Sequence, residues 1–303
     1  MYHRAMTAAT VQPTQTAEVN EALPRGGAPL GPDSLTWQFF GDWRIALIGP
    51  RAGVLQNMLP SLGQGVEDHS VWFQDTLARL ARSIPPIFGT LYNDDGGETG
   101  RKVRDFHRHI KGKLPDGGPY SALNPHTYYW AHACFVDSMV AGVETFIRPL
   151  TLGEKDQIIA ESVTWYHRYG VAEPVLDGEG IPRTWSEFAR YFARMSDEEL
   201  VRHRTAAYGM GYTTKGWPRP KRIDPLLWKV VRRPLNAVSS SISIGGMPPQ
   251  GREILGLPWD QTRERRYQRF ASVVRRTRPV IDALPRRWRM HPIPARAFAR
   301  EGR

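Results

Sequence analysis

Apolar and polar residues follow each other along most of the chain with a period of three to four residues, which is typical of amphipathic α-helices. The clearest such segment runs from Asn124 to Ile147. Asn124 can cap the free amides of the first turn. Pro125 suits the first helical position, because the N–H that it lacks would have no partner there. We therefore predict one long buried helix over this segment.

Shorter helices are predicted on both sides of it. They cover residues 51–59, 76–92, 98–111, 152–168, 185–195, 197–207, 225–239 and 259–281. Pro85 and Pro86 should break or kink the second of these, because both rings remove a hydrogen-bond donor and clash with the preceding turn. The only β-like run is Ser239 to Ile244. The pattern predicts a mostly α-helical protein.

Residues 1–33 are rich in Ala, Thr, Pro and Gly without periodicity, which indicates a flexible arm. No linker divides residues 34–303, so we expect a single domain, and a hydrophobic content of 41% is ample for its core. No run of eighteen apolar residues exists, so no membrane span is predicted. Cys134 is the single cysteine. Together with the lack of a continuous apolar stretch near the N-terminus, it leads us to expect a cytoplasmic protein.

The net charge of +11 is concentrated at the C-terminal end. Residues 252–303 contain 14 arginines, no lysine and 5 acidic residues. This basic segment is either a solvated helix face or a surface that docks on an anionic partner. Residues 263–278 mix arginines with apolar residues, so a helix there could lie at the periphery of an anionic membrane. Nucleic acid is the less expected partner.

His132 lies on the apolar face of the long predicted helix, one turn after Tyr128 and one turn before Val136. Two interpretations are open. The imidazole either bonds a buried polar group of the core or ligates something, and a neutral imidazole nitrogen in a dry pocket is what a haem iron requires. Usual catalytic motifs are missing: there is no P-loop, no Rossmann glycine fingerprint, no HExxH, no CxxC and no GxSxG.

The basic helix over residues 98–111 is the second candidate element. Arg104 and His107 share one of its faces. They either belong to a solvated basic surface or point toward whatever His132 binds. Such a face could also pair with the two carboxylates of a haem, and Arg79 and Arg82 are further candidates for that task.

Several motifs in a fixed order carry a family resemblance. They are HS, LARLARS, RKVRDFHRHIKG, a Gly/Pro loop, YWAHACFVDS, PLTLGEKDQIIAES, YGV, LPW and RRWRMHP. This order resembles the catalytic-domain family of rubber oxygenases (latex-clearing proteins) and MpaB-type oxygenases over roughly residues 37 to 295. The resemblance implies a globin-like all-α fold, with additional N- and C-terminal helices here, that holds b-type haem through one proximal histidine. His132 stands at the matching position and would be the iron ligand.

The distal side of the family uses an arginine, a lysine and a threonine on the preceding helix. This sequence offers Lys102 and Arg104 there, with His107 or Arg108 where the threonine is expected. It also lacks a clear counterpart of the carboxylate proposed as base in rubber cleavage. These departures argue against polyisoprene as the substrate and leave haem binding unaffected.

Together these observations predict a haem-dependent oxygenase that acts on a hydrophobic, isoprenoid-like small molecule. His132 would bind the iron, Arg79 and Arg82 would assist haem binding, and Lys102, Arg104 and His107 would act at the catalytic side. The alternative is a non-catalytic helical protein whose basic C-terminal segment binds nucleic acid or an anionic membrane.

Overall fold

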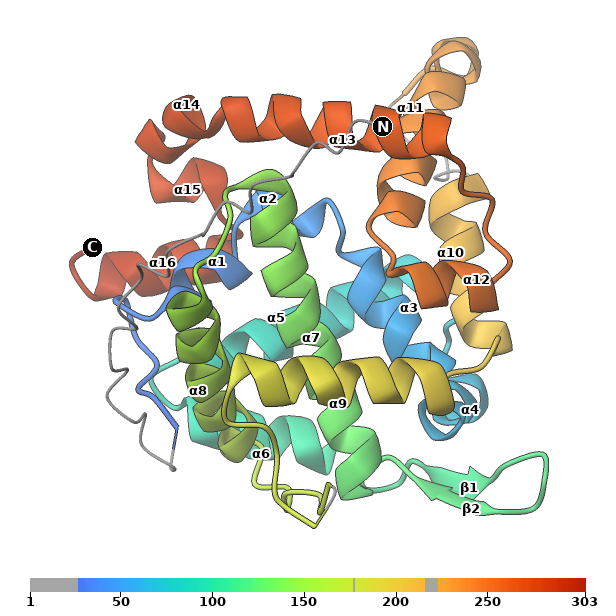
Figure 1. Cartoon of the computed structure of the whole chain (residues 1–303), viewed down its shortest axis with the longest axis vertical. Coiled ribbons are helices and arrows are strands. Elements are labelled where there is room, and N and C mark those ends of the chain that lie inside the picture. Colours follow the sequence, from blue (N-terminus) through green and yellow to red (C-terminus); the bar gives the residue numbers. More distant parts are fainter. Residues whose placement is uncertain (1–26, 177, 216–222) are drawn as a thin grey trace, which may run out of the picture.

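The computed structural model describes residues 27–176, 178–215 and 223–303 of the 303-residue chain. Helices surround one long central helix, α7 (Pro125–Phe146), as Figure 1 shows. In the described residues, the only regular strands form one short hairpin. The prediction of an all-α fold class is confirmed.

The elements before α7 include one long helix, α5, and the hairpin. They are α1 (Leu35–Phe40), α2 (Trp43–Ala46), α3 (Pro50–Met58), α4 (Pro60–His69), α5 (Thr76–Tyr92), α6 (Gly96–Asp105), β1 (Lys111–Lys113) and β2 (Pro119–Ser121). The elements after α7 are all helical. They are α8 (Leu152–Arg168), α9 (Trp185–Glu198), α10 (Arg204–Lys215), α11 (Pro225–Gly245), α12 (Pro249–Ile254), α13 (Gln261–Arg276), α14 (Arg278–Ala283), α15 (Arg286–Arg289) and α16 (Pro292–Arg300).

Helix α7 begins and ends where the sequence predicts. The side chain of Asn124 accepts hydrogen bonds from the backbone N–H groups of His126 and Thr127, and Pro125 is the first helical residue. The helix packs against α2, α3, α8 and α13, so most of its residues are buried. Trp130, fully buried, donates its indole N–H to the carbonyl oxygen of Leu55 in α3. The central helix is therefore fixed by both its cap and its packing.

Helices α8 and α9 start with reciprocal capping boxes. In α8 the hydroxyl of Thr151 accepts from the N–H of Glu154, whose carboxylate accepts from the N–H of Thr151. Thr184 and Glu187 form the same pair at the start of α9. Each box satisfies two backbone donors that the first turn leaves free. Thr184 stands directly before the helix predicted over residues 185–195, so this cap lies where that prediction places the start of the helix.

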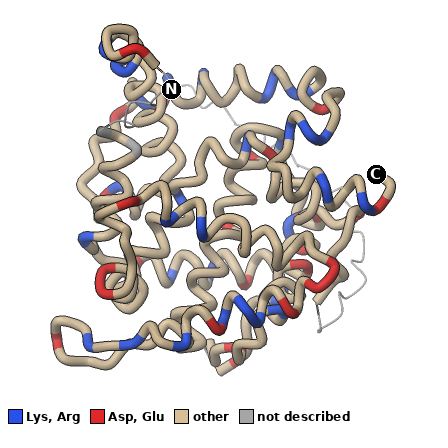
Figure 2. Tube along the Cα trace, turned by 180° about the vertical axis from the view of Figure 1, so that it is seen from behind, with Lys and Arg blue, Asp and Glu red and all other residues tan. Residues whose placement is uncertain are grey.

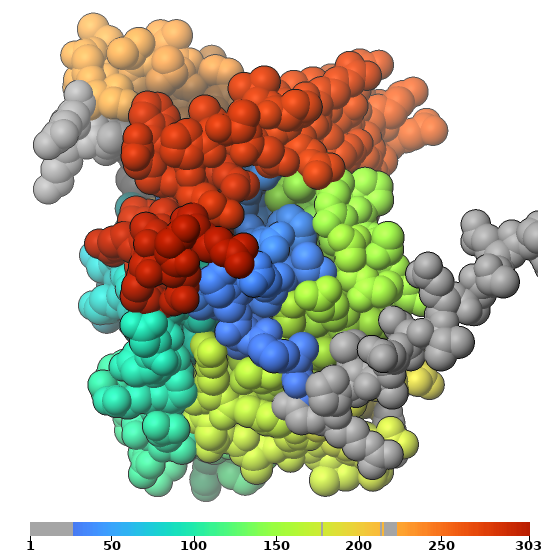
Figure 3. Space-filling view, turned by 90° about the vertical axis from the view of Figure 1, so that its left-hand side faces the viewer, coloured from blue at the N-terminus to red at the C-terminus, as the bar shows by residue number. Residues whose placement is uncertain are grey.

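The N-terminal described segment is bound to α8. Residues 1–26 of the predicted arm lie outside the described residues, and residues 27–33 contain neither helix nor strand. The N–H of Ala28 donates to the carbonyl oxygen of Ala160 over 2.9 Å. The buried carboxylate of Glu161 accepts from the N–H groups of Leu35 and Thr36. Figure 3 shows this segment in blue, beside the helices that follow α7.

The C-terminal helices return to the start of the fold. The N–H of His291 donates to the carbonyl oxygen of Gly41 over 2.9 Å, and Met290 pairs with Asp42 in an isolated β-bridge. A Cβ atom on Gly41 would lie 2.3 Å from Cγ of Pro294, so the two segments approach more closely than a side chain would allow. Figure 3 shows the red C-terminal helices directly beside the blue segment that opens the described part of the chain.

Helix α5 runs unbroken through Pro85 and Pro86, so the predicted break does not occur. The carbonyl groups that lose their donors belong to Ala81 and Arg82, and both residues are exposed. Water can satisfy these carbonyls, and the helix can continue through both proline residues.

Two further local predictions are also wrong. Ser239 to Ile244 forms the last turns of α11 rather than a strand, because Ile242 and Ile244 are buried there against other helices. Tertiary packing outweighs their β-propensity. The helix expected over residues 98–111 ends at Asp105, and Lys111–Lys113 pairs with Pro119–Ser121 in the hairpin.

No described helix is long and apolar enough to cross a membrane. Cys134 is fully buried on α7, and burial raises the pKa of its thiol, so it is a packed side chain. Figure 2 shows basic and acidic residues interspersed along the Cα trace. Within α13, six arginines accompany one acidic residue, Glu264.

Candidate functional site

The imidazole of His132 lies in the middle of the core, and the side chain is only 3% exposed. Three aromatic rings from the last turn of α8 and the residue directly after it surround it, with centroids 4.8 Å (Trp165), 5.4 Å (Tyr166) and 6.1 Å (Tyr169) away. These rings recur at one- and three-residue spacing, so a single face of α8 supplies all of them. The sequence analysis missed this aromatic shell, although the run TWYHRY in α8 carried the signal.

Neither ring nitrogen of His132 makes a hydrogen bond of normal geometry. Burial lowers the pKa of His132 to about 3, although the backbone of Ser162 lies near enough to favour the protonated form. The imidazole is therefore neutral at physiological pH and has a free lone pair. Buried polar groups are normally satisfied, so an unpartnered imidazole at the centre of the core is a candidate ligand.

The described residues contain no group of three or more His, Cys, Asp and Glu side chains that could hold a metal ion. A non-haem iron site needs such a group, for example two histidines and a carboxylate. A haem iron needs only one protein ligand, because the macrocycle supplies the others. Among the described residues, His132 therefore has no second and third side-chain ligand of that kind beside it.

A chain of aromatic contacts connects His132 to helix α6. The ring of Tyr169 lies 5.3 Å from the ring of Tyr128, which in turn lies 5.9 Å from the ring of His107. Nδ1 of His107 lies 2.7 Å from the carbonyl oxygen of Val103, so Nδ1 carries the proton and Nε2 keeps a lone pair. Burial, aided by the charge of Arg79, lowers the pKa of His107 and keeps it neutral.

Arg104 joins α6 to the end of α8. Its Nη1 donates to the carbonyl oxygen of Gly170 over 3.2 Å, and its Nε donates to the carboxylate of Asp105 over 2.9 Å. The two helices can approach because Gly100 has no side chain. A Cβ atom there would lie 2.2 Å from the carbonyl oxygen of Arg168. The structure thus brings Arg104 and His107 to the same end of the aromatic core.

The remaining predicted site residues lie farther out. Arg79 is half-buried in α5 and donates to the hydroxyl of Ser83 over 2.6 Å. Burial lowers its pKa, and the charge of Arg82 acts in the same direction. Arg82 is exposed, and Lys102 forms a surface ion pair with Glu98 at 2.7 Å. Among the predicted site residues, His132 is thus buried, and His107, Arg104 and Arg79 are half-buried. Arg82 and Lys102 are exposed at the surface.

Comparison with known proteins completes this description. Neither the curated proteins nor the solved structures give a match. Residues 37–276 match the family described as the catalytic domain of ER-bound oxygenase mpaB/B′ and rubber oxygenase. The matched segment includes α2 to α13 and contains every candidate residue named above. The chain therefore belongs to the mpaB/rubber oxygenase catalytic-domain family.

Proposed function

We propose that this protein is a b-type haem-dependent oxygenase in which His132 is the axial iron ligand and the substrate is a hydrophobic, isoprenoid-like molecule. One observation carries the proposal. A neutral, buried imidazole without a hydrogen-bond partner lies at the centre of a chain that belongs to an oxygenase family. When bound, haem would supply the activation of oxygen, and the protein would supply the binding and orientation.

The α8 rings have two roles in this proposal. Trp165, Tyr166 and Tyr169 exclude water from the imidazole and keep it neutral, as a ligand must be. They also contact the ring directly, so we expect some of them to change rotamer when a macrocycle binds. Haem addition should therefore change the tryptophan fluorescence of the wild-type protein by more than that of a Trp165→Phe variant.

Arg104 and His107 are the proposed polar groups of the catalytic side. Nε2 of His107 can accept a proton or a hydrogen bond, since Nδ1–H is already held by Val103. Arg104 can provide a cationic donor. Lys102 would have to leave its pair with Glu98 to act with them. An exposed pair of this kind is weak, so it does not prevent the role.

Arg79 and Arg82 are the proposed partners of the haem carboxylates. Arg79 is enclosed, and no acidic side chain contributes to its pKa, which burial lowers. A carboxylate from a ligand would compensate for the lost solvation. Arg82, one turn along α5, could extend toward the second carboxylate. The globin-like arrangement implied by the family resemblance is part of the same proposal.

A hydrophobic substrate is supported by the incomplete burial of the apolar face of α5. Leu77 is 46% exposed and Ile84 is 39% exposed, although the sequence pattern directs both inward. Leu80 and Ile87, on the same face, are half-buried. Apolar side chains left uncovered next to a candidate site suit contact with a greasy molecule.

We also propose peripheral contact with an anionic membrane, from which such a substrate could be collected. On α13, Tyr267 and Ala271 face the core, while the outer side exposes several arginines: Arg265, Arg266, Arg269 and Arg276. The neighbouring helix α11 exposes Leu226 (70%) and Val230 (71%) next to further basic residues. Exposed apolar and cationic side chains together are typical of helices that lie at a membrane interface.

The experiment that tests the proposed cofactor is the absorption spectrum of protein purified with haem supplied. The wild-type protein should show a Soret band, and His132→Ala should lose it. His109→Ala is the matched control, because His109 is exposed on the segment after α6. Equal haem content in the two variants would contradict the assignment of His132.

A further inference from the structure

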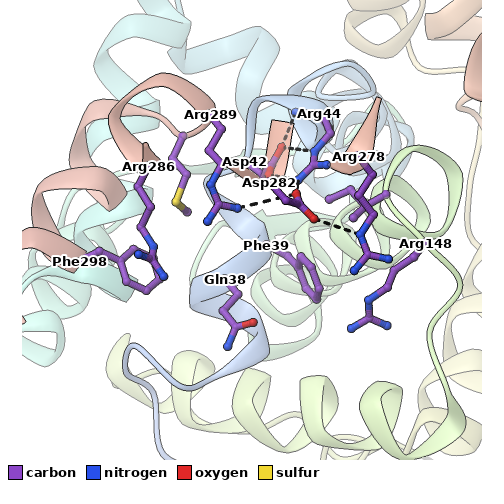
Figure 4. A pocket seen from close by; sticks show the side chains of 12 residues that line it. Gln38, Phe39, Asp42, Arg44, Arg148, Arg278, Asp282, Arg286, Arg289 and Phe298 are labelled. Carbon is purple, nitrogen blue, oxygen red and sulfur yellow. Dashed lines mark hydrogen bonds and ion pairs between the residues drawn. The ribbon is translucent and has the colours of Figure 1, made fainter. Parts of the chain in front are cut away.

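A second site lies where the first described helices meet the C-terminal helices. It is a cavity of about 180 Å³ bounded by α1 and α2, by the residues after α7 and by the C-terminal helices α14 to α16 (Figure 4). Much of its wall comes from residues 278–298, which follow the segment that matches the oxygenase family. None of the residues that line the cavity belongs to the site around His132.

The cavity wall carries a surplus of positive charge. Its charged residues are five arginines and two aspartates, namely Arg44, Arg148, Arg278, Arg286, Arg289, Asp42 and Asp282. Glu154, outside the wall, pairs with Arg148 and reduces the surplus from three charges to two.

One carboxylate is shared by three of these arginines. Asp282 lies 2.8 Å from Arg44, 3.0 Å from Arg278 and 4.0 Å from Arg289. Figure 4 shows the three side chains converging on it from different elements. Asp42 also pairs with Arg44, so two carboxylates face three guanidinium groups and the cluster keeps one excess positive charge.

Two buried donors of the cluster have no partner. Arg44 is 5% exposed, and its Nε and Nη2 bond to Asp42 and Asp282, but its Nη1 has no acceptor. Nε of Arg289 is also buried without an acceptor. Leaving a charged donor unsatisfied in a buried position is costly, so these atoms indicate that an anion completes the site.

Arg286 supplies a further cation to the cavity. Its guanidinium lies over the ring of Phe298, 4.5 Å from the centroid, and makes no hydrogen bond or ion pair with the described part of the chain. Burial and the charges of Arg289 and Arg303 lower its pKa, so nothing nearby compensates its charge. The aromatic contact orients the side chain and leaves its donors available.

We propose that this cavity binds a phosphate group, carried either by a free phosphate or diphosphate or by the headgroup of an anionic phospholipid. A phosphate monoester carries between one and two negative charges at neutral pH, which matches the surplus. Its oxygens can accept from several arginines at once, often in the bidentate manner that guanidinium groups favour. The cavity is smaller than the 300–1,000 Å³ typical of drug-sized ligands, so it would take the phosphate group rather than a whole lipid.

The first arm of the test is calorimetric titration of the full chain with inorganic phosphate and with pyrophosphate at constant ionic strength. Two variants make a matched pair, because Arg286→Gln and Arg287→Gln remove the same charge from the same helix. Only Arg286 lines the cavity, and Arg287 is exposed. We expect saturable binding that Arg286→Gln weakens about tenfold or more, equivalent to about 1.4 kcal/mol, and that Arg287→Gln leaves unchanged.

The second arm uses flotation with vesicles that contain phosphatidic acid. A loss of vesicle binding specific to Arg286→Gln, without binding of free phosphate, would assign the site to a lipid headgroup. A loss of phosphate or pyrophosphate binding that is specific to Arg286→Gln, without a specific loss of vesicle binding, would assign the site to a soluble anion. The proposal is overturned if Arg286→Gln and Arg287→Gln behave alike in both arms. Vesicle binding that both variants keep would come from the charge of α13 and not from the cavity.

A third variant keeps the test informative if Arg286→Gln folds poorly. Asp282→Asn removes the carboxylate that competes with the ligand for the arginines. The phosphate group should therefore bind more tightly to this variant, in whichever arm detects its binding. Unchanged or weaker binding in a folded Asp282→Asn protein would contradict the site. None of these measurements requires haem, so the outcome is independent of the function proposed for His132.

Discussion

Replacing His132 with leucine distinguishes two roles of this residue, that of a ligand and that of an ordinary hydrogen-bonded histidine of the core. The two side chains have similar volumes, and the site is surrounded by apolar and aromatic groups. In a protein prepared without haem, the neutral imidazole buries two nitrogens that make no normal hydrogen bond. An unsatisfied buried polar group destabilises a fold by about 1–3 kcal/mol, so His132→Leu should be as stable as the wild-type protein or more so near neutral pH.

The pH dependence gives the larger effect. The pKa of His132 falls from 6.5 to about 3 on folding, so the unfolded chain binds a proton more readily than the native one. Stability is therefore lost as the pH falls below 6.5 toward 3. At about 1.4 kcal/mol per pH unit, this loss has an upper limit of roughly 5 kcal/mol. His132→Leu cannot bind that proton, so its advantage should grow as the solution becomes more acidic.

The assay is urea unfolding followed by circular dichroism near neutral pH and again at about pH 4.5, with the midpoint and slope compared between proteins. The control is His109→Leu, the same substitution at an exposed position. A His132→Leu protein that is less stable than the wild type by about 1–3 kcal/mol near neutral pH would refute the reasoning. It would mean that the imidazole forms a hydrogen bond, most simply with the backbone of Ser162, and has a structural role.

Three further predictions follow from the same structure. Arg104→Ala and His107→Ala should keep haem but change the spectra of the carbon monoxide or imidazole complexes, and unchanged spectra in both would remove them from the site. Arg79→Gln should weaken haem retention by several-fold and Arg82→Gln by less, because Arg79 is half-buried and Arg82 is exposed. Haem titration of both variants measures the difference. Flotation should occur with anionic but not neutral vesicles and weaken with salt, at about 1 kcal/mol per arginine of α13 near the surface. Duplex DNA bound at physiological salt while anionic vesicles are ignored would contradict the membrane proposal.

The sequence alone determined the parts of this protein that depend on neighbouring residues. The start of α7 follows from Asn124 and Pro125, and the start of α9 from Thr184, because caps act within a single turn. The burial of His132 follows from the period of the apolar residues around it. These local signals were sufficient to predict an all-α protein with a core histidine.

Tertiary structure decided what surrounds these elements. The aromatic shell of His132 comes from α8, and its rings reach the imidazole only because α7 and α8 pack together. Packing also turned residues 239–244 into helix, and solvent exposure allowed α5 to continue through Pro85 and Pro86. The arginine-lined cavity joins Arg44 to Asp282, which are 238 residues apart in the chain. No periodicity predicts a contact across so many residues of the chain. The sequence therefore identified the arginine-rich segment only as basic. The fold determined which of its arginines lie together.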